Sequence, residues 1–532
     1  MSGQQSFGKL KSFLWPVHRH EVKKLVPMLI LFFLITFIYN LLRPTKISLM
    51  VMAEGSGTEV IPYLKLWAVL PGAFLITYFF TLVANRFTRE QTFYIMLSLF
   101  LGYFLLFAGF LYPHREILQL DSFASLLQGI LPAGCRGFVS IVRHWNLSIF
   151  YVMSELWATI ILSMLFWGYA NEVSTIEEAK RFYGVFVLAS NISGIFCGQV
   201  GKALSLKHTV SFLPIGYTAW EQSVVLIVAV AVVLGAIIIG TFAYLNRVVI
   251  HAELQQSHAI HNKTVSELQK ETPKMHLSLF ECFAYLKQSR YLCYLTLIVV
   301  SYNIVYNLSE VIWTEEARQI YSNPVDFNAY MNQITSVTGV LSTIMALFVC
   351  SKVIRKFGWL TAALISPIIW LFTSLGFFSF FILEEFSLAD GIYAFFNSPH
   401  NLALIFGSAQ IALGRATKYT VFDETKEIAF IPLSKENQRK GKAVVDGIAG
   451  WVGRSGGSII YQTLLLVCVN IAATIPYVAV MFFIVIGVWI YSVRALGKMV
   501  EKNVDENVDQ MLEEIIEKEL DPASDSAVVT PL

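Results

Sequence analysis

The chain has 532 residues, of which 56% are hydrophobic and only 14% are charged, and its mean hydropathy is +0.60. These values exclude a water-soluble globular protein and indicate a polytopic membrane protein whose surroundings are the lipid bilayer. The formal net charge is only +2, and no nucleic-acid partner is expected.

Apolar runs long enough to cross a bilayer recur along the whole chain. A helix needs roughly 20 such residues to span the hydrocarbon core. The fifth and eleventh runs carry several Gly, Ser, Asn or Asp residues, which is typical of helices that pack closely or line a cavity. We therefore expect an all-α protein with twelve transmembrane helices, near Leu25–Leu42, Leu66–Ala84, Thr92–Tyr112, Leu147–Ala170, Phe182–Leu204, Gln222–Leu245, Tyr291–Trp313, Met331–Ser351, Trp359–Leu383, Asn401–Lys418, Val444–Val469 and Ile471–Val493.

The basic residues of the loops predict the orientation of these helices. Most lie on the side that holds the N-terminal segment, the stretch between the sixth and seventh runs, and the tail, so both termini are expected in the cytoplasm. The first run is too long for a signal peptide and is interpreted as a retained helix. The six cysteines form no CxxC motif and predict neither a disulfide framework nor a zinc site.

Weak internal similarity predicts two halves of six helices each. "IYNLLR" at the end of the first run resembles "VYNLSE" at the end of the seventh, which pairs Tyr39 with Tyr306 and Arg43 with Glu310. This is the major-facilitator plan, in which the substrate binds near the membrane midplane and access alternates between the two sides. We expect a monomer with a cytoplasmic N-terminal segment (1–24), a first half (25–245), a cytoplasmic linker (246–290), a second half (291–496) and an acidic cytoplasmic tail (497–532).

Ionisable residues inside predicted spans are the first candidates for function, because a charge in the membrane is costly unless it serves a site. They fall in the first, fourth, seventh, tenth and eleventh runs, and the first four of these line the cavity of a major-facilitator fold. The candidates for substrate binding are Arg43, Lys46, Glu155, Glu310, Arg415, Lys418 and Arg454.

Most of these charges also have a structural interpretation, which for Glu310 is strengthened by its position close to the end of its span. Arg43 and Lys46 are long enough to reach the headgroups as interfacial anchors. Glu155 has no basic residue near it in sequence, so its structural alternative is a buried salt bridge. Arg415 and Lys418 have Asp423 and Glu424 beside them and could form an ion-paired helix end at the membrane surface.

The balance of these charges is positive, which predicts an anionic solute and favours phosphate. Arg454 lies in "GRSGG", where small residues let the backbone approach closely, a setting that suits an anion better than a lipid tail. His251, His258 and His261 lie in a polar stretch interpreted as a solvated linker, so no metal site or cofactor is expected. No phosphate-binding loop or hydrolase motif supports the rival interpretation, a polytopic phosphate-transferring enzyme.

Several longer motifs resemble the ATP/ADP translocase family of obligate intracellular bacteria and plastids. They include "FYVMSELW", "MLFWGYANEVSTIEEAKRFY", "YNLSEVIW", "KYTVFDETKEIAFIPL" and "GKAVVDGIAGWVGRSGG", and the resemblance runs from about Phe7 to Leu496. It implies a nucleotide transporter in the bacterial inner membrane, often one that exchanges ATP for ADP and phosphate. It also implies functional roles for Lys46, Glu155, Glu310 and Arg454.

The chain departs from the family pattern at two places. Exchangers of this family usually have "RDTKD" where this chain has "RPTKI", so Pro44 and Ile47 replace two acids. At the last motif the plastid relatives have "GKSGG", where Arg454 of this chain keeps the charge but changes its shape. The leading hypothesis is nucleotide exchange by alternating access. The alternatives are a proton-coupled symporter of GTP, UTP or ATP and an NAD carrier. Glu155 and Glu310 are the coupling candidates, and phosphate or a proton is the possible co-transported species.

Overall fold

The computed structural model describes residues 17–18, 21–211, 216–250, 289–385, 399–433, 438 and 441–520. Regular structure in these ranges is entirely helical. Most of the predicted N-terminal segment, nearly all of the 246–290 linker with its three histidines, and residues 521–532 of the tail lie outside the described residues.

The described part of the first half of the chain contains long helices interrupted by short π-helical segments. Its elements are α2 (Val22–Val51), α3 (Val60–Tyr63), η1 (Leu64–Val69), α4 (Leu70–Arg86), α5 (Arg89–Leu106), η2 (Phe107–Leu111), α6 (Arg115–Leu118), α7 (Asp121–Ile130), η3 (Ala133–Cys135), α8 (Arg136–Arg143), α9 (Trp145–Trp157), η4 (Ala158–Phe166), α10 (Trp167–Val173), α11 (Ile176–Leu204), α12 (Ala219–Tyr244) and η5 (Leu245–Ile250).

The described part of the second half has the same character. Its elements are α15 (Arg290–Ile320), α16 (Pro324–Met345), η6 (Ala346–Cys350), α17 (Ser351–Glu385), α19 (Pro399–Thr417), η7 (Lys418–Phe422), α20 (Asp423–Ala429), η8 (Ala443–Ala449), α22 (Gly450–Cys468) and α23 (Ile471–Leu520). Local π-helical turns are frequent at functional sites, because they rotate the side chains that follow.

Ten helices of the described part are long and apolar enough to cross a membrane. They contain ten of the twelve predicted spans. The other two, Asn401–Lys418 and Val444–Val469, are also helical and lie in α19 and in η8 with α22, but they do not meet that criterion of length and hydropathy. The low hydropathy of the eleventh run follows from its polar and glycine residues.

Helix ends follow from local sequence at several places. Thr88, Thr175 and Thr218 each begin a helix with a capping box, in which the threonine hydroxyl and a Gln or Glu three residues later satisfy backbone N–H groups. The first helix is longer than predicted: α2 continues through Pro44 to Val51, so that residues 43–46 lie inside the helix and not at its end.

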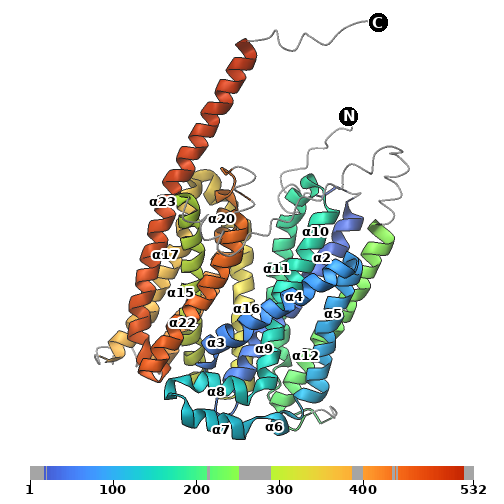
Figure 1. Ribbon diagram of the computed structural model, residues 1–532, viewed down its shortest axis with the longest axis vertical. Helices are drawn as coiled ribbons and strands as arrows, with labels where there is room; N and C mark the ends of the chain where they lie inside the picture. The colour runs from blue at the N-terminus through green and yellow to red at the C-terminus, as the bar shows by residue number, and fades with distance from the viewer. Residues whose placement is uncertain are drawn as a thin grey trace.

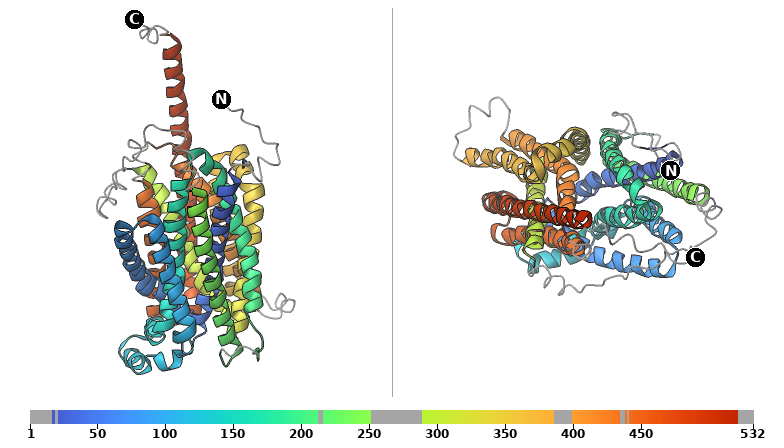
Figure 2. Two further views of the ribbon diagram at one scale, coloured as in Figure 1. Left: turned by 90° about the vertical axis from the view of Figure 1, so that its right-hand side faces the viewer. Right: turned by 90° about the horizontal axis from the view of Figure 1, so that it is seen from above.

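The helices form two groups that meet along a seam between α11 and α16 (Figure 1). Figure 2 shows the two groups side by side when the molecule is seen from above. At the seam, a Cβ atom on Gly339 would lie 2.7 Å from the backbone nitrogen of Ile195, so glycine permits this close contact. Gly198 makes a similarly close approach to the backbone of Asn332.

The two groups also touch at the end opposite the start of α2 (Figure 1). There the Thr58 hydroxyl donates a 2.5 Å hydrogen bond to Glu315, and the Gln462 side-chain amide donates to the Pro62 carbonyl at 3.0 Å. The short helices α6, α7 and α8 lie across the same end. These contacts join the two groups at this end of the molecule.

Candidate functional site: a cationic cavity between the two helix groups

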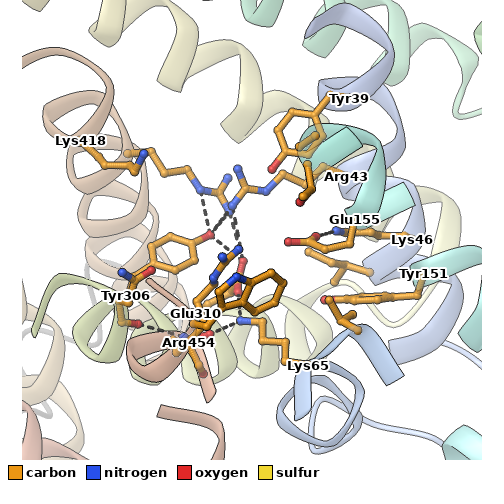
Figure 3. A pocket seen from close by; sticks show the side chains of 18 of the residues that line it. Tyr39, Arg43, Lys46, Lys65, Tyr151, Glu155, Tyr306, Glu310, Lys418 and Arg454 are labelled. Atoms are coloured by element: carbon orange, nitrogen blue, oxygen red, sulfur yellow. Dashed lines mark hydrogen bonds and ion pairs between the residues drawn. The ribbon is translucent and has the colours of Figure 1, made fainter. Parts of the chain in front are cut away.

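A cavity of about 490 Å³ lies between the two helix groups (Figure 3). Its wall carries six cationic side chains and two carboxylates, a formal excess of four positive charges. All seven residues selected from the sequence line it, together with Lys65, which was not selected. The charged residues of the wall are Arg43, Lys46, Lys65, Glu155, Glu310, Arg415, Lys418 and Arg454.

Glu310 on α15 is the centre of the largest charge cluster in the cavity. Its carboxylate lies 2.6 Å from the Lys65 ammonium, 3.4 Å from the Arg415 guanidinium and 3.8 Å from that of Arg43. The side chain of Glu310 is only 5% exposed. A carboxylate with this little access to water needs several partners, and three cations from three different helices supply them.

Tyr306, one helical turn before Glu310, holds the same cluster together. Its hydroxyl donates a 2.6 Å hydrogen bond to Glu310 and accepts hydrogen bonds from Arg43 at 2.5 Å and Arg415 at 2.7 Å. The guanidinium carbons of Arg43 and Arg415 lie 5.9 Å and 5.6 Å from the centre of its ring. Tyr306 therefore fixes both arginines at one point of the wall. Arg43 also donates a 3.4 Å hydrogen bond to the Tyr419 hydroxyl, and the guanidinium groups still have further N–H donors for a ligand.

Lys46 and Glu155 form a second, separate ion pair between α2 and α9 (Figure 3). The Lys46 ammonium also lies 4.6 Å from the centre of the Tyr151 ring. The Lys46 side chain is 2% exposed, and Arg43 points into the cavity, so the interfacial-anchor interpretation is wrong for both residues. The structural alternative for Glu155, a salt bridge, is present, but the pair lies in the cavity wall and Glu155 is 30% exposed.

Arg454 differs from the other arginines of the cavity. Within the described ranges no carboxylate lies within ion-pair distance of it, and its guanidinium carbon stacks 4.4 Å from the centre of the Trp451 ring. The glycines around it bring α22 against α15, where a Cβ atom on Gly453 would lie 2.7 Å from the Asn303 side chain. The prediction that "GRSGG" serves close backbone approach is therefore confirmed, and Arg454 has no acidic partner among the residues that the structure describes.

Arg415 and Lys418 were predicted as a possible ion-paired helix end, and the structure separates them. Lys418 lies 3.0 Å from Asp423, as that interpretation expects, although it also lines the cavity. Arg415 is buried and pairs with Glu310 instead. The π-helical segment η7 begins at Lys418, and the change of helical turn there directs the two side chains to different partners.

Sequence reasoning missed Lys65, although its signal was present. The second apolar run was predicted to begin at Leu66, so Lys65 lay just outside it. The helix begins earlier, at Val60, and Lys65 lies in its π-helical segment η1, where it contacts both Glu310 and Asn307. Tyr151 was also not selected. Tyr306 was recognised only as the counterpart of Tyr39 in the weak repeat, since aromatic residues are common throughout the chain.

Comparison of the sequence with known families gives one match over nearly the whole chain. Residues 1–500 match the model of the TLC ATP/ADP transporter family. ADP,ATP carrier protein 1 of Chlamydia trachomatis is 41% identical over 499 residues, covering 94% of this chain and 92% of the relative. ADP,ATP carrier protein 4 of Rickettsia conorii is 32% identical over 497 residues, covering 92% of this chain and 94% of the relative.

Comparison of the structure with solved structures identifies the fold. The nucleoside transporter NupG matches with a TM-score of 0.54 at 12% identity, covering 89% of this chain and 99% of NupG. The inward-open xylose transporter XylE from E. coli matches with a TM-score of 0.51 at 14% identity, covering 89% of this chain and 94% of XylE. The predicted fold class, an all-α polytopic protein of the major-facilitator type, is confirmed.

Proposed function

Because this chain belongs to the TLC ATP/ADP transporter family and is a nucleotide transporter, we propose that it exchanges ATP for ADP by alternating access. The observation that carries the proposal is the excess of four positive charges in a cavity between two helix groups. Fixed cations in a partly dehydrated cavity attract a polyphosphate strongly, and guanidinium groups match phosphate oxygens in geometry.

Four of the six cations of the cavity fall into two classes by their acidic partners. Arg454 has no acidic partner in the described part of the chain, and the acidic contact of Arg43 there is a long one, 3.8 Å from Glu310, beside its hydrogen bond to the Tyr306 hydroxyl. We assign these two to direct phosphate contacts. Lys46 and Lys65 are each paired with a carboxylate, so a phosphate group would have to displace Glu155 or Glu310 to reach them. The two acids thus act as internal counter-ions of the empty site.

This arrangement favours exchange over one-way transport. When the two helix groups close over the cavity, they remove it from water, and an uncompensated buried charge is costly. A bound nucleotide neutralises the excess charge and lowers that cost, whereas the empty cavity keeps it. Reorientation should therefore be fast with nucleotide bound and slow without it, which is the kinetic requirement for obligatory exchange.

Both predicted coupling acids are ion-paired, which also favours exchange over proton symport. Glu310 contacts three cations and Glu155 contacts Lys46, so protonation of either residue would break an ion pair.

The start of α2 and the basic loops mark the proposed cytoplasmic end. The contacts between the two groups close the opposite end, so the conformation described here would open toward the cytoplasm (Figure 1).

Uptake into proteoliposomes tests the proposal. Labelled ATP is offered to vesicles that are empty or loaded with ADP, with and without a pH gradient. We expect uptake only into loaded vesicles, with or without the gradient. Uptake into empty vesicles that an uncoupler abolishes would establish proton symport instead. Parallel assays with labelled phosphate, GTP, UTP, CTP and NAD define the co-transported species and the substrate range. Absence of uptake of every nucleotide would overturn the proposed function.

A pair of variants compares the loss of a cation in the cavity with the loss of a cation on the exposed surface. Lys46→Gln removes a buried cation of the cavity, and we expect it to lower ATP uptake at least tenfold. Arg89→Gln removes a cation of an exposed ion pair with Glu172, whose side chains are 65% and 51% exposed, and it serves as the control. Such a surface pair contributes little, so uptake by Arg89→Gln should equal that of the wild type. Equal uptake by both variants would remove Lys46 from the site.

A further inference from the structure

A second cavity of about 380 Å³ adjoins the cationic one. The two share part of their walls, including Tyr39, Arg43 and Ser163. The second cavity has a different character, because uncharged residues dominate its own part of the wall. Phe32 and Trp167 supply aromatic surface, and Asn40, Asn191 and Ser342 supply polar groups. A ligand that reaches through both cavities would be highly charged at one end and mostly uncharged at the other.

Several polar groups of this second cavity have no protein partner. The side-chain amide of Asn40 is partly exposed and makes no hydrogen bond within the described part of the chain. The Asn191 amide nitrogen and the Ser342 hydroxyl are buried and also lack a partner among the described residues. Buried polar groups in proteins are nearly always satisfied, so those without a partner call for an explanation.

Pro44 also removes the hydrogen-bond donor that the main-chain carbonyl of Asn40 would have in a regular α-helix. In an α-helix the N–H of residue 44 would donate to the carbonyl of residue 40, but proline has no N–H. The main-chain carbonyl of Asn40 therefore lacks its helical donor. Asn40 lies one helical turn before Arg43 on α2, a rise of about 4.5 Å. A residue whose side-chain amide makes no hydrogen bond in the described part of the chain, and whose carbonyl has lost its i+4 donor, thus lies beside the cationic cavity.

We propose that the second cavity binds the base of the nucleotide, and that Asn40 reads the N6 and N7 edge of adenine; this rests on the proposed function. An amide offers one donor and one acceptor side by side, which matches the N6 amino group and N7 of adenine. Guanine and hypoxanthine present two acceptors at that edge, O6 and N7, and repel the amide oxygen. Tyr39, between the two cavities, supplies a ring on which the base stacks.

Competition against labelled ATP uptake tests this assignment with three probes: ATP, ITP and 7-deaza-ATP. ITP replaces the N6 amino group with an oxygen, and 7-deaza-ATP lacks the N7 acceptor. For the wild type we expect ITP to compete about tenfold more weakly than ATP, and 7-deaza-ATP several-fold more weakly. Equal competition by all three on the wild type would overturn the assignment, even if no variant can be prepared.

Two asparagine variants test whether Asn40 is the residue that recognises the base. In Asn40→Ala the three probes should compete with labelled ATP to within about twofold of one another, mainly because competition by ATP becomes weaker. Asn303→Ala is the matched control, since Asn303 lines only the cationic cavity and its amide bonds to the Val299 carbonyl at 2.8 Å. This control should keep the wild-type preference.

Two results with these variants would overturn the assignment. If Asn40→Ala weakens all three probes equally, Asn40 only packs against Gly194, which lies beside it. An unchanged preference in Asn40→Ala would place the base elsewhere. Failure of the proposed function is distinguishable from both outcomes, because the wild type would then take up no ATP at all.

Discussion

Replacing Glu310 with Gln tests the role of the acid as an internal counter-ion. The change keeps the size of the side chain and removes its charge, so Lys65, Arg43 and Arg415 lose the carboxylate they share. Breaking a buried ion pair costs roughly 3–5 kcal/mol, because the remaining charge is left without compensation. The cavity admits water, so we expect the lower end, about 3 kcal/mol, in the protein without nucleotide.

Bound nucleotide should offset most of this cost, because its phosphates replace the missing negative charge. A stabilisation of about 3 kcal/mol on binding corresponds to a roughly 100-fold lower Kd. We therefore expect Glu310→Gln to melt at a lower temperature than the wild type without ATP. It should bind ATP about 10- to 100-fold more tightly and show a larger rise of Tm when ATP is added. Transport should fall at least tenfold, since tight binding slows release.

Differential scanning fluorimetry and equilibrium binding in detergent measure these quantities. Glu172→Gln is the control, because it removes an equally charged residue from an exposed pair with Arg89 and should change neither Tm nor Kd measurably. Unchanged or weaker ATP binding by Glu310→Gln would refute the counter-ion reasoning. So would an unchanged Tm in the absence of nucleotide.

Three further predictions test other parts of the structure. Lys65→Met removes one cation of the cavity and should raise the KM for ATP about tenfold in the uptake assay, whereas an unchanged KM would exclude Lys65 from the site. Gly339→Ala places a Cβ atom 2.7 Å from the backbone of Ile195 and should lower stability by about 1–3 kcal/mol, while Gly240→Ala, with open space around it, should not. Burial lowers the pKa of His144, which lies just before the fourth span, from its usual value near 6.5. A base with a lowered pKa in the folded state favours folding above its unfolded pKa and loses this contribution as pH falls through the folded pKa. Tm should therefore fall between pH 7 and pH 5, and His144→Gln, which does not titrate, should show a smaller fall; equal falls would contradict the assignment.

The spans were predictable because the bilayer demands long apolar helices, and apolar runs of that length are easily recognised. Their ends were less predictable, and this affected the site directly. Arg43 and Lys46 were predicted at the end of the first span, yet α2 continues to Val51. Lys65 lay one residue before the predicted start of the second span, yet the helix begins at Val60. In both cases tertiary contacts keep a charged residue inside the helix, and no local pattern reports such contacts.

The candidate residues were predictable from the cost of charge in a membrane, but their partners were not. Nothing near Glu155 in sequence indicated a cation, and its partner Lys46 is 109 residues away. The weak repeat paired Arg43 with Glu310, and the structure brings these two residues to 3.8 Å across the cavity. The division of the chain into two six-helix halves at the expected boundaries stays a prediction.

The glycine contact between α11 and α16 has a consequence for how the transporter moves. The closest approaches in this contact, at Gly198 and Gly339, are to the backbone of the other helix, so few side chains obstruct a rolling motion of one helix on the other. Side-chain hydrogen bonds from Gln199 to Ser336 and from Lys202 to Gln333 also cross the contact and would have to rearrange. A joint with so few specific contacts contributes little to the difference in energy between the two orientations. The difference in energy between the two orientations must then come from other parts of the protein. Polar contacts such as that of Thr58 with Glu315 contribute at one end, and the charge of the nucleotide contributes in the cavity. Small changes at that end should therefore shift which side of the membrane the empty carrier faces, and leave the site itself unaltered.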